Sequence, residues 1–226
     1  VSCGDFRLDC DARGDYTRLL RQISRLTDEM KLQTKNRYID QLRLRRHLPQ
    51  ARIYLNSGRQ NVFARFLKWN GYEVGRLLVD ASSSPLTGLN GRLSADSVVA
   101  AHFLLDTIRV TVSSDSARTL YKAQIRNNEH NPDYTFNALL SGGVFERGAY
   151  ASTEVYDAAN RLGLRLGLAA AMVSNGIKLH MYGKEPILGY KRFDANKDNF
   201  ILLADDDRIS ANLKLTAADG MGVQLY

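Results

Sequence analysis

The stretch Ala169-Ala-Ala-Met-Val-Ser-Asn-Gly-Ile-Lys-Leu179 continues a long apolar run from Leu162 to Val173. The run is rich in glycine and alanine and too short to span a membrane, so it predicts a helix buried in the middle of a globular domain. On that helix Asn175 and Lys178 share one face, because they are three residues apart. An amide and an amine on a buried helix need polar partners or a cleft. The pair is therefore either part of a functional site or a cap of the helix end.

The composition is that of an ordinary soluble protein of 226 residues, 44% hydrophobic and 24% charged. We expect one domain, residues 1–226, large enough to bury a core without crosslinks. The formal charge of +7 favours a polyanion partner such as RNA, although a basic protein without a nucleic-acid role is the alternative. We find no stretch of transmembrane length and no signal segment, and the first residue, Val1, suggests a processed amino terminus, which is compatible with a removed signal.

The two cysteines, Cys3 and Cys10, lie close together near the amino terminus. They either pair in an oxidising compartment or stay free, and the sequence leaves both open. Without histidines at ligand spacing they do not predict a zinc site. We expect no metal and no cofactor.

The first half of the chain predicts mainly strands. Residues 6–9 alternate as a strand does, and Asp15 is a candidate N-cap for a helix from Tyr16 to Met30. A basic connection follows at residues 31–50. Strands are expected at residues 52–55, 61–67 and 72–79, with Asn70-Gly71 as a hairpin turn between the last two.

The second half predicts mainly helix. We expect a helix and then a strand at residues 98–105 and 108–112, and helices from residue 117, one starting near Glu154 after a cap at Ser152 or Thr153. Short strands at residues 177–182, 187–193 and 200–203 end the chain. The expected class is α+β: a mixed or antiparallel N-terminal sheet with helices (1–112), a central helical region (113–180) and a small C-terminal β/α region (181–226).

Four segments together resemble the ribosome-inactivating proteins, the family of the ricin A chain and Shiga toxin A. They are residues 6–27, with Asp15-Tyr-Thr-Arg-Leu-Leu-Arg21; residues 62–75, ending Asn70-Gly-Tyr-Glu-Val-Gly75; Met172-Val-Ser-Asn-Gly-Ile-Lys-Leu179; and Ile201-Leu-Leu-Ala-Asp-Asp-Asp-Arg-Ile-Ser210. The resemblance covers nearly the whole chain and implies that family's fold. It also implies an rRNA N-glycosidase, which removes one adenine from large-subunit ribosomal RNA and blocks translation.

The resemblance assigns roles to individual residues. Tyr72 stands at the first adenine-stacking position, and Tyr121, with Tyr134 as the alternative, at the second. Asn175 stands where the family has its catalytic glutamate, and Lys178 where it has its arginine. Asp206 and Arg208 lie near the position of the family's tryptophan, and a cleft around Tyr72, Asn175 and Lys178 is expected.

These substitutions predict weak or lost depurination, because an amide neither balances the sugar cation nor acts as a base. Two alternatives remain open: an active glycosidase that uses Glu73, Glu154 or an aspartate from Asp205 to Asp207 instead, and a non-catalytic basic RNA-binding domain. The resemblance further implies ribosomal RNA and adenine as ligands, a galactose-binding lectin B chain as partner, and a secreted or vacuolar, seed-storage location.

Overall fold

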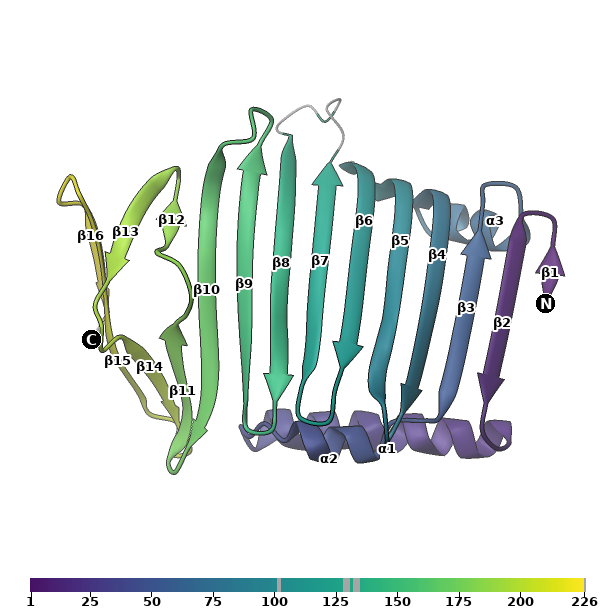
Figure 1. Cartoon of the computed structure of the whole chain (residues 1–226), viewed down its shortest axis with the longest axis horizontal. Helices are drawn as coiled ribbons and strands as arrows, with labels where there is room; N and C mark the ends of the chain where they lie inside the picture. The colour runs from purple at the N-terminus through teal and green to yellow at the C-terminus, as the bar shows by residue number, and fades with distance from the viewer. Residues whose placement is uncertain (101–102, 128–130, 132–134, 226) are drawn as a thin grey trace.

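The computed structural model describes residues 1–100, 103–127, 131 and 135–225. Strands make up 58% of the described residues and helices 16%. The expected α+β class with a central helical region is therefore wrong. The protein is a large antiparallel β-sheet accompanied by a few helices (Figure 1).

The described part of the chain forms three helices and sixteen strands. The helices are α1 (Tyr16–Lys35), α2 (Gln41–Arg46) and α3 (Val62–Trp69). The strands of the first half are β1 (Ser2–Cys3), β2 (Phe6–Ala12), β3 (Ala51–Ser57), β4 (Tyr72–Ser84), β5 (Gly88–Ala100), β6 (Phe103–Ser114) and β7 (Thr119–Asn127). Those of the second half are β8 (Phe136–Phe145), β9 (Gly148–Asp157), β10 (Leu162–Val173), β11 (Gly176–Met181), β12 (Ile187–Leu188), β13 (Lys191–Ala195), β14 (Phe200–Ala204), β15 (Ile209–Ala217) and β16 (Gly222–Leu225).

The sheet is a meander in which each strand from β1 to β11 pairs with the next one along the chain. Beyond β11 the order becomes β14, β15, β13 and β12, and β10 also pairs with β12. The C-terminal strands thus fold back beside the end of the sheet, as the left side of Figure 1 shows.

The apolar run at residues 162–173 is strand β10, not a buried helix. Leucines occupy every second position from Leu162 to Leu168, which is the two-residue period of a strand. The intervening positions include Gly163 and Gly167, and these small residues made an alternating pattern resemble a continuous apolar segment. Asn175 follows β10 in a turn and Lys178 lies on β11, so no helix carries them.

Other expected helices are strands as well. Residues 98–105 belong to β5 and β6 where they are described, and the region 113–180 contains β7 to β11. Glu154 lies inside β9 rather than at a helix start. These segments pair instead with the neighbouring strands of the meander. Packing against cross-strand partners outweighs the local helix propensity of a segment.

One expected strand, residues 61–67, is helix α3. The side chain of Asn61 caps it, accepting a hydrogen bond from the backbone N of Ala64 at 2.8 Å. The turn at Asn70-Gly71 therefore joins a helix to β4 and does not form a hairpin. Gly71 has a φ of +83°, which glycine adopts readily.

Several expectations are confirmed. Strands cover residues 6–9, 52–55, 72–79 and 200–203, and α1 begins after Asp15, whose carboxylate accepts from the backbone N of Arg18 at 2.6 Å. The basic connection after Met30 is more structured than expected, because α1 continues to Lys35 and α2 follows.

The sheet leaves much of its apolar surface uncovered. The one cluster of buried hydrophobic residues in the described ranges comprises Phe193, Leu215 and Ala217, at the C-terminal strands. No large side chain is fully buried among the described residues. The chain exposes 14656 Å², whereas a compact monomer of 25.3 kDa exposes about 10,300 Å².

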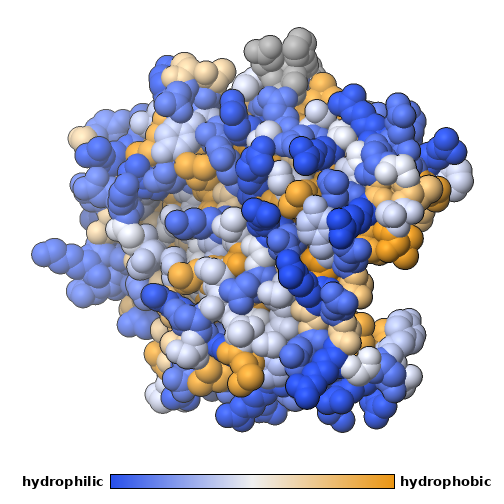
Figure 2. Space-filling model, turned by 45° about the vertical axis from the view of Figure 1, so that its right-hand side comes forward, coloured by the Kyte–Doolittle hydropathy of each residue, from blue (hydrophilic) through white to orange (hydrophobic). Residues whose placement is uncertain are grey.

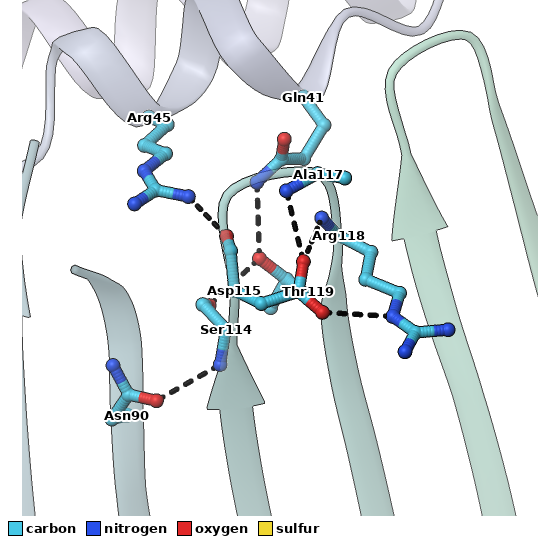
Figure 3. A network of polar contacts seen from close by, with 8 residues as sticks. All are labelled: Gln41, Arg45, Asn90, Ser114, Asp115, Ala117, Arg118 and Thr119. Carbon is cyan, nitrogen blue, oxygen red and sulfur yellow. Dashed lines mark hydrogen bonds and ion pairs between the residues drawn. The ribbon is translucent and has the colours of Figure 1, made fainter. Parts of the chain in front are cut away.

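Helix α2 is attached to the turns at the lower end of the sheet. The buried Arg45 donates hydrogen bonds to the backbone carbonyls of Pro85 and Leu86 in one turn and of Asp115 in another. Gln41 reaches Thr119 at the start of β7, 3.2 Å away (Figure 3). Arg45 and Gln41 thereby attach α2 to the β4–β5 hairpin and to the β6–β7 hairpin.

We predict that Arg45→Ala lowers the free energy of unfolding by about 2–4 kcal/mol, because three carbonyls lose their charged donor at a buried position. Urea unfolding measures this. Arg46→Ala, at the exposed neighbouring position of the same helix, is the matched control and should change the free energy by less than about 0.5 kcal/mol. Equal effects of the two changes would contradict the anchoring role of Arg45.

Candidate functional site

The structure does not gather Tyr72, Asn175 and Lys178 around one cleft. Tyr72 is the first residue of β4, and Lys178 lies on β11 with six strands, β5 to β10, in between. Seven strand spacings correspond to about 34 Å along the sheet. The two strands also begin at opposite ends of the sheet, since β4 starts at the top of Figure 1 and β11 at the bottom.

The expected second stacking ring is also apart from Tyr72. Tyr121 lies near the start of β7, at the lower end of the sheet, and is partly buried against Gly142 of the next strand. The alternative, Tyr134, lies outside the described residues.

Asp206 and Arg208 do lie near Asn175. The carbonyl of Asn175 accepts from the backbone N of Asp205 at 3.1 Å, and Arg208 Nε donates to Asp206 at 2.6 Å in the same turn region. This hydrogen bond from Arg208 holds the pKa of the Asp206 carboxyl below its usual value. The turn is exposed, and Asp206 and Arg208 form a local ion pair there rather than line a pocket.

Glu73 and Glu154, the glutamates considered as replacements for the family's catalytic glutamate, already have other partners. Glu73 pairs with Lys68 at 2.8 Å, on β4. Glu154 accepts from the hydroxyl of Tyr156 at 2.8 Å and from Arg165 at 2.9 Å, on the distant strand β9.

Cys3 and Cys10 are both exposed and not bonded to each other. Across the described ranges, no cluster of three or more histidine, cysteine, aspartate or glutamate side chains is arranged to hold a metal ion. Nor does any described helix combine the length and apolar character needed to cross a membrane.

The sheet itself carries the most distinctive arrangement, a row of apolar side chains that crosses nine strands. Residues paired directly across neighbouring strands point to the same side of a sheet. From β2 to β6 the row consists of Leu8, Leu55, Val79, Leu93 and Val110. From β7 to β10 it continues through Ala123, Leu140, Thr153 and Leu166.

Rows two residues away on each side have the same character. One passes through Leu77, Ala95, Ile108, Ile125, Ala138 and Val155. The other passes through Ile53, Ala81, Val112, Tyr121, Leu168 and Met181. We call the side of the sheet formed by these three rows the apolar face.

The opposite side, the polar face, contains the alternate residues. The row next to the central apolar row reads Asp9, Tyr54, Asp80, Arg92, Thr111 and Lys122 from β2 to β7. Its cations are largely paired: Arg109 lies 3.2 Å from Asp96, and Arg165 lies 2.9 Å from Glu154. A hollow of about 460 Å³ lies on this face, with Arg109 and Glu154 among the residues that line it.

The apolar face has shallower hollows, lined almost wholly by carbon. One, of about 160 Å³, is surrounded by Val79, Leu89, Leu93 and Val110. A second, of about 280 Å³, is lined by Tyr121, Val144 and Ala170 among others. Leu168 borders this hollow and is 46% exposed. Solvent therefore reaches the apolar face at several points along its width.

Helices stand on the same side as the apolar face, at both ends of the strands. Below, the backbone N of Ile39, just before α2, lies 3.0 Å from the sulfur of Met172, which belongs to this face. Above, Phe63 of α3 packs on Phe6 with ring centroids 5.8 Å apart. Figure 1 shows α1 and α2 crossing the lower ends of the strands and α3 near the upper ends of β2 to β4. The face is thus a trough, and Figure 2 shows a notch at one edge of the molecule with hydrophobic residues along its rim.

A buried polar cluster joins α1 to α2 at the lower end of the trough. The carboxylate of Glu29 accepts from Gln33 at 3.0 Å and from the hydroxyl of Tyr38 at 3.1 Å, and Arg43 of α2 lies 3.1 Å away. The hydrogen bond from Gln33 contributes most to holding the pKa of the Glu29 carboxyl below its usual value, and the Tyr38 hydroxyl and the Arg43 charge lower it further. The charged form of Glu29 therefore stabilises this end of the trough.

We predict that acid loosens this cluster. A lowered folded pKa means that the stabilisation is complete above the unfolded value of about 4.3 and is lost as the pH falls through the folded pKa. The free-energy difference between the native protein and Glu29→Gln should therefore shrink between about pH 6 and about pH 3. Urea unfolding across this range measures it, with Asp28→Asn on the exposed side of the same helix as the control. A difference that stays constant with pH would contradict the role of Glu29.

Comparisons with known proteins identify no relative: no family model, no curated protein and no solved structure matches the chain. We therefore infer function from the geometry of the described residues.

Proposed function

We propose that the protein binds the acyl chains of lipids on the apolar face of its sheet. One observation carries the proposal: a row of almost wholly aliphatic side chains crosses nine paired strands, and every member of the row is only partly buried. A monomeric soluble protein rarely leaves contiguous apolar patches larger than a few hundred Å² uncovered. A patch of this extent is typical of a surface that something apolar occupies.

An acyl chain fits this face because it needs no hydrogen bonds. The backbone groups of the central strands are already paired within the sheet, so a peptide strand finds no free edge on the face itself. The side chains of the central row offer one hydroxyl, that of Thr153, among eight apolar groups. A polar ligand would lose its water contacts here without replacement.

The energy available is sufficient for useful affinity. Each methylene removed from water contributes about 0.8 kcal/mol, so burying ten of them contributes about 8 kcal/mol before the entropic costs of binding. The face is several strands wide, and more than one chain could lie across it.

A second copy of this protein is a less suitable occupant. Two sheets pack about 10 Å apart, whereas a helix with its side chains is about 10–12 Å across. Helices α1 and α2 at one end and α3 at the other stand on the same side as the apolar face. They occupy space that a second sheet would need.

We do not propose depurination of ribosomal RNA, the activity implied by the sequence resemblance, because Tyr72 and Lys178 are separated by six strands. A general RNA-binding surface is not favoured either. Arginines of the polar face pair with carboxylates, as in the 2.7 Å contact of Arg7 with Asp9, and so have less charge to offer a phosphate backbone.

We predict saturable binding of a fluorescent long-chain fatty acid to the delipidated protein, displaced by unlabelled palmitate. Leu168→Glu places a carboxylate on the apolar face and should weaken binding at least about tenfold, because the chain would desolvate a charge. The partial exposure of Leu168 leaves room for the new side chain without disturbing the fold.

Ala171→Glu is the matched control: it lies on the same strand, exposed, on the opposite face. It should bind the fatty acid as the native protein does. Equal affinity of both variants, or a native protein that dimerises through this face and binds no fatty acid, would refute the proposal. Circular dichroism and urea unfolding of each variant confirm that the fold is retained.

A further inference from the structure

Helix α3 has two apolar sides, and only one of them is used by the fold. The inner side packs on the sheet through Phe63 and Leu67, which are partly buried. The outer side carries Val62, Phe66 and Trp69, spaced by four and three residues and therefore on one stripe. Their exposed fractions are 74%, 54% and 85%. A tryptophan is highly buried on average, so its position on the outside of this helix requires an explanation.

We call Val62, Phe66 and Trp69 the rim patch, because α3 lies at the upper end of the sheet, opposite α1 and α2 (Figure 1).

Basic side chains border the rim patch. Arg65 lies on α3 beside the stripe, is exposed, and forms no ion pair with any described residue. Lys68, on the same helix, forms an ion pair with Glu73, and both side chains are exposed. A short helix with an aromatic stripe and adjoining cations has the composition of segments that lie in the interface of a bilayer, where tryptophan and tyrosine sit among headgroups and cations attract anionic lipids.

We propose that the rim patch docks on the surface of a lipid bilayer, with Trp69 inserted at headgroup level. The position of the patch complements the proposed function, on which this second part rests: docking would hold the upper end of the trough against the bilayer from which acyl chains enter. The lower end, along β2 to β9, is bordered by α1 and α2 instead. Docking itself requires only the rim patch and can be tested independently of the trough.

The chain contains one tryptophan, so its fluorescence reports on this site alone. We expect vesicles of phosphatidylcholine with phosphatidylglycerol to shift the emission of Trp69 to shorter wavelength, and brominated acyl chains to quench it. Phosphatidylcholine alone should give a weaker response, because the contribution of Arg65 and Lys68 is lost. Vesicle flotation of the full chain provides the second measurement.

Phe66→Ser keeps the reporter and should lower the vesicle partition coefficient about tenfold, the equivalent of 1.4 kcal/mol. Leu86→Ser is the control: Leu86 is 87% exposed, in the turn between β4 and β5 at the lower end, and should have no effect. The absence of any emission shift or quenching with both vesicle types would overturn the proposal. So would vesicle binding that Phe66→Ser leaves unchanged, or an emission shift that appears with protein concentration alone, which would indicate contact between copies.

The two proposals fail separately. Leu168→Glu should lose fatty-acid binding while Trp69 still responds to vesicles, and Phe66→Ser should lose the vesicle response while the fatty acid still binds in solution. A vesicle response of the native protein without fatty-acid binding would remove the trough function and leave the docking site. The reverse result would remove the docking site alone.

Discussion

Register is the constraint on which the rest of this structure depends. Side chains alternate between the two sides of a strand, so a slip of one residue would exchange the two faces of that strand. Here the pairings hold Val79 beside Leu93 and Leu93 beside Val110, while Asp80 lies beside Arg92. The ladder of backbone hydrogen bonds thereby sorts an alternating sequence into one apolar and one polar surface.

The sorting leaves the protein without a closed core over most of its sheet. The helices of the described chain pack at the two ends of the apolar face, and the one buried hydrophobic cluster of the described residues lies at the C-terminal strands around Phe193 and Leu215. Stability then depends on hydrogen bonds within the sheet, on ion pairs of the polar face and on the attachment of α2 through Arg45. Occupation of the apolar face would add hydrophobic stabilisation that the chain does not supply itself.

The helices shape this surface without covering it. Glu29 and its partners join α1 to α2 at one end of the strands, and Phe63 fixes α3 at the other. A trough between two helical ends suits a flexible apolar chain better than a rigid flat partner. The rim patch extends the same chemistry to the outside of α3, where aromatic rings replace the aliphatic side chains of the trough.

The sequence by itself determined the elements whose signals are local. Asp15 marked the start of α1, and the strands at residues 52–55 and 72–79 followed from their β-branched and aromatic residues. It did not determine β10, because Gly163, Gly167 and Ala169 on the polar side hid the alternation of the leucines. Nor did it reveal the candidate site: a single strand shows which residues alternate, but only pairing with other strands places Leu55, Val110 and Leu140 in one row. That row is a property of non-local register, and tertiary structure alone decided it.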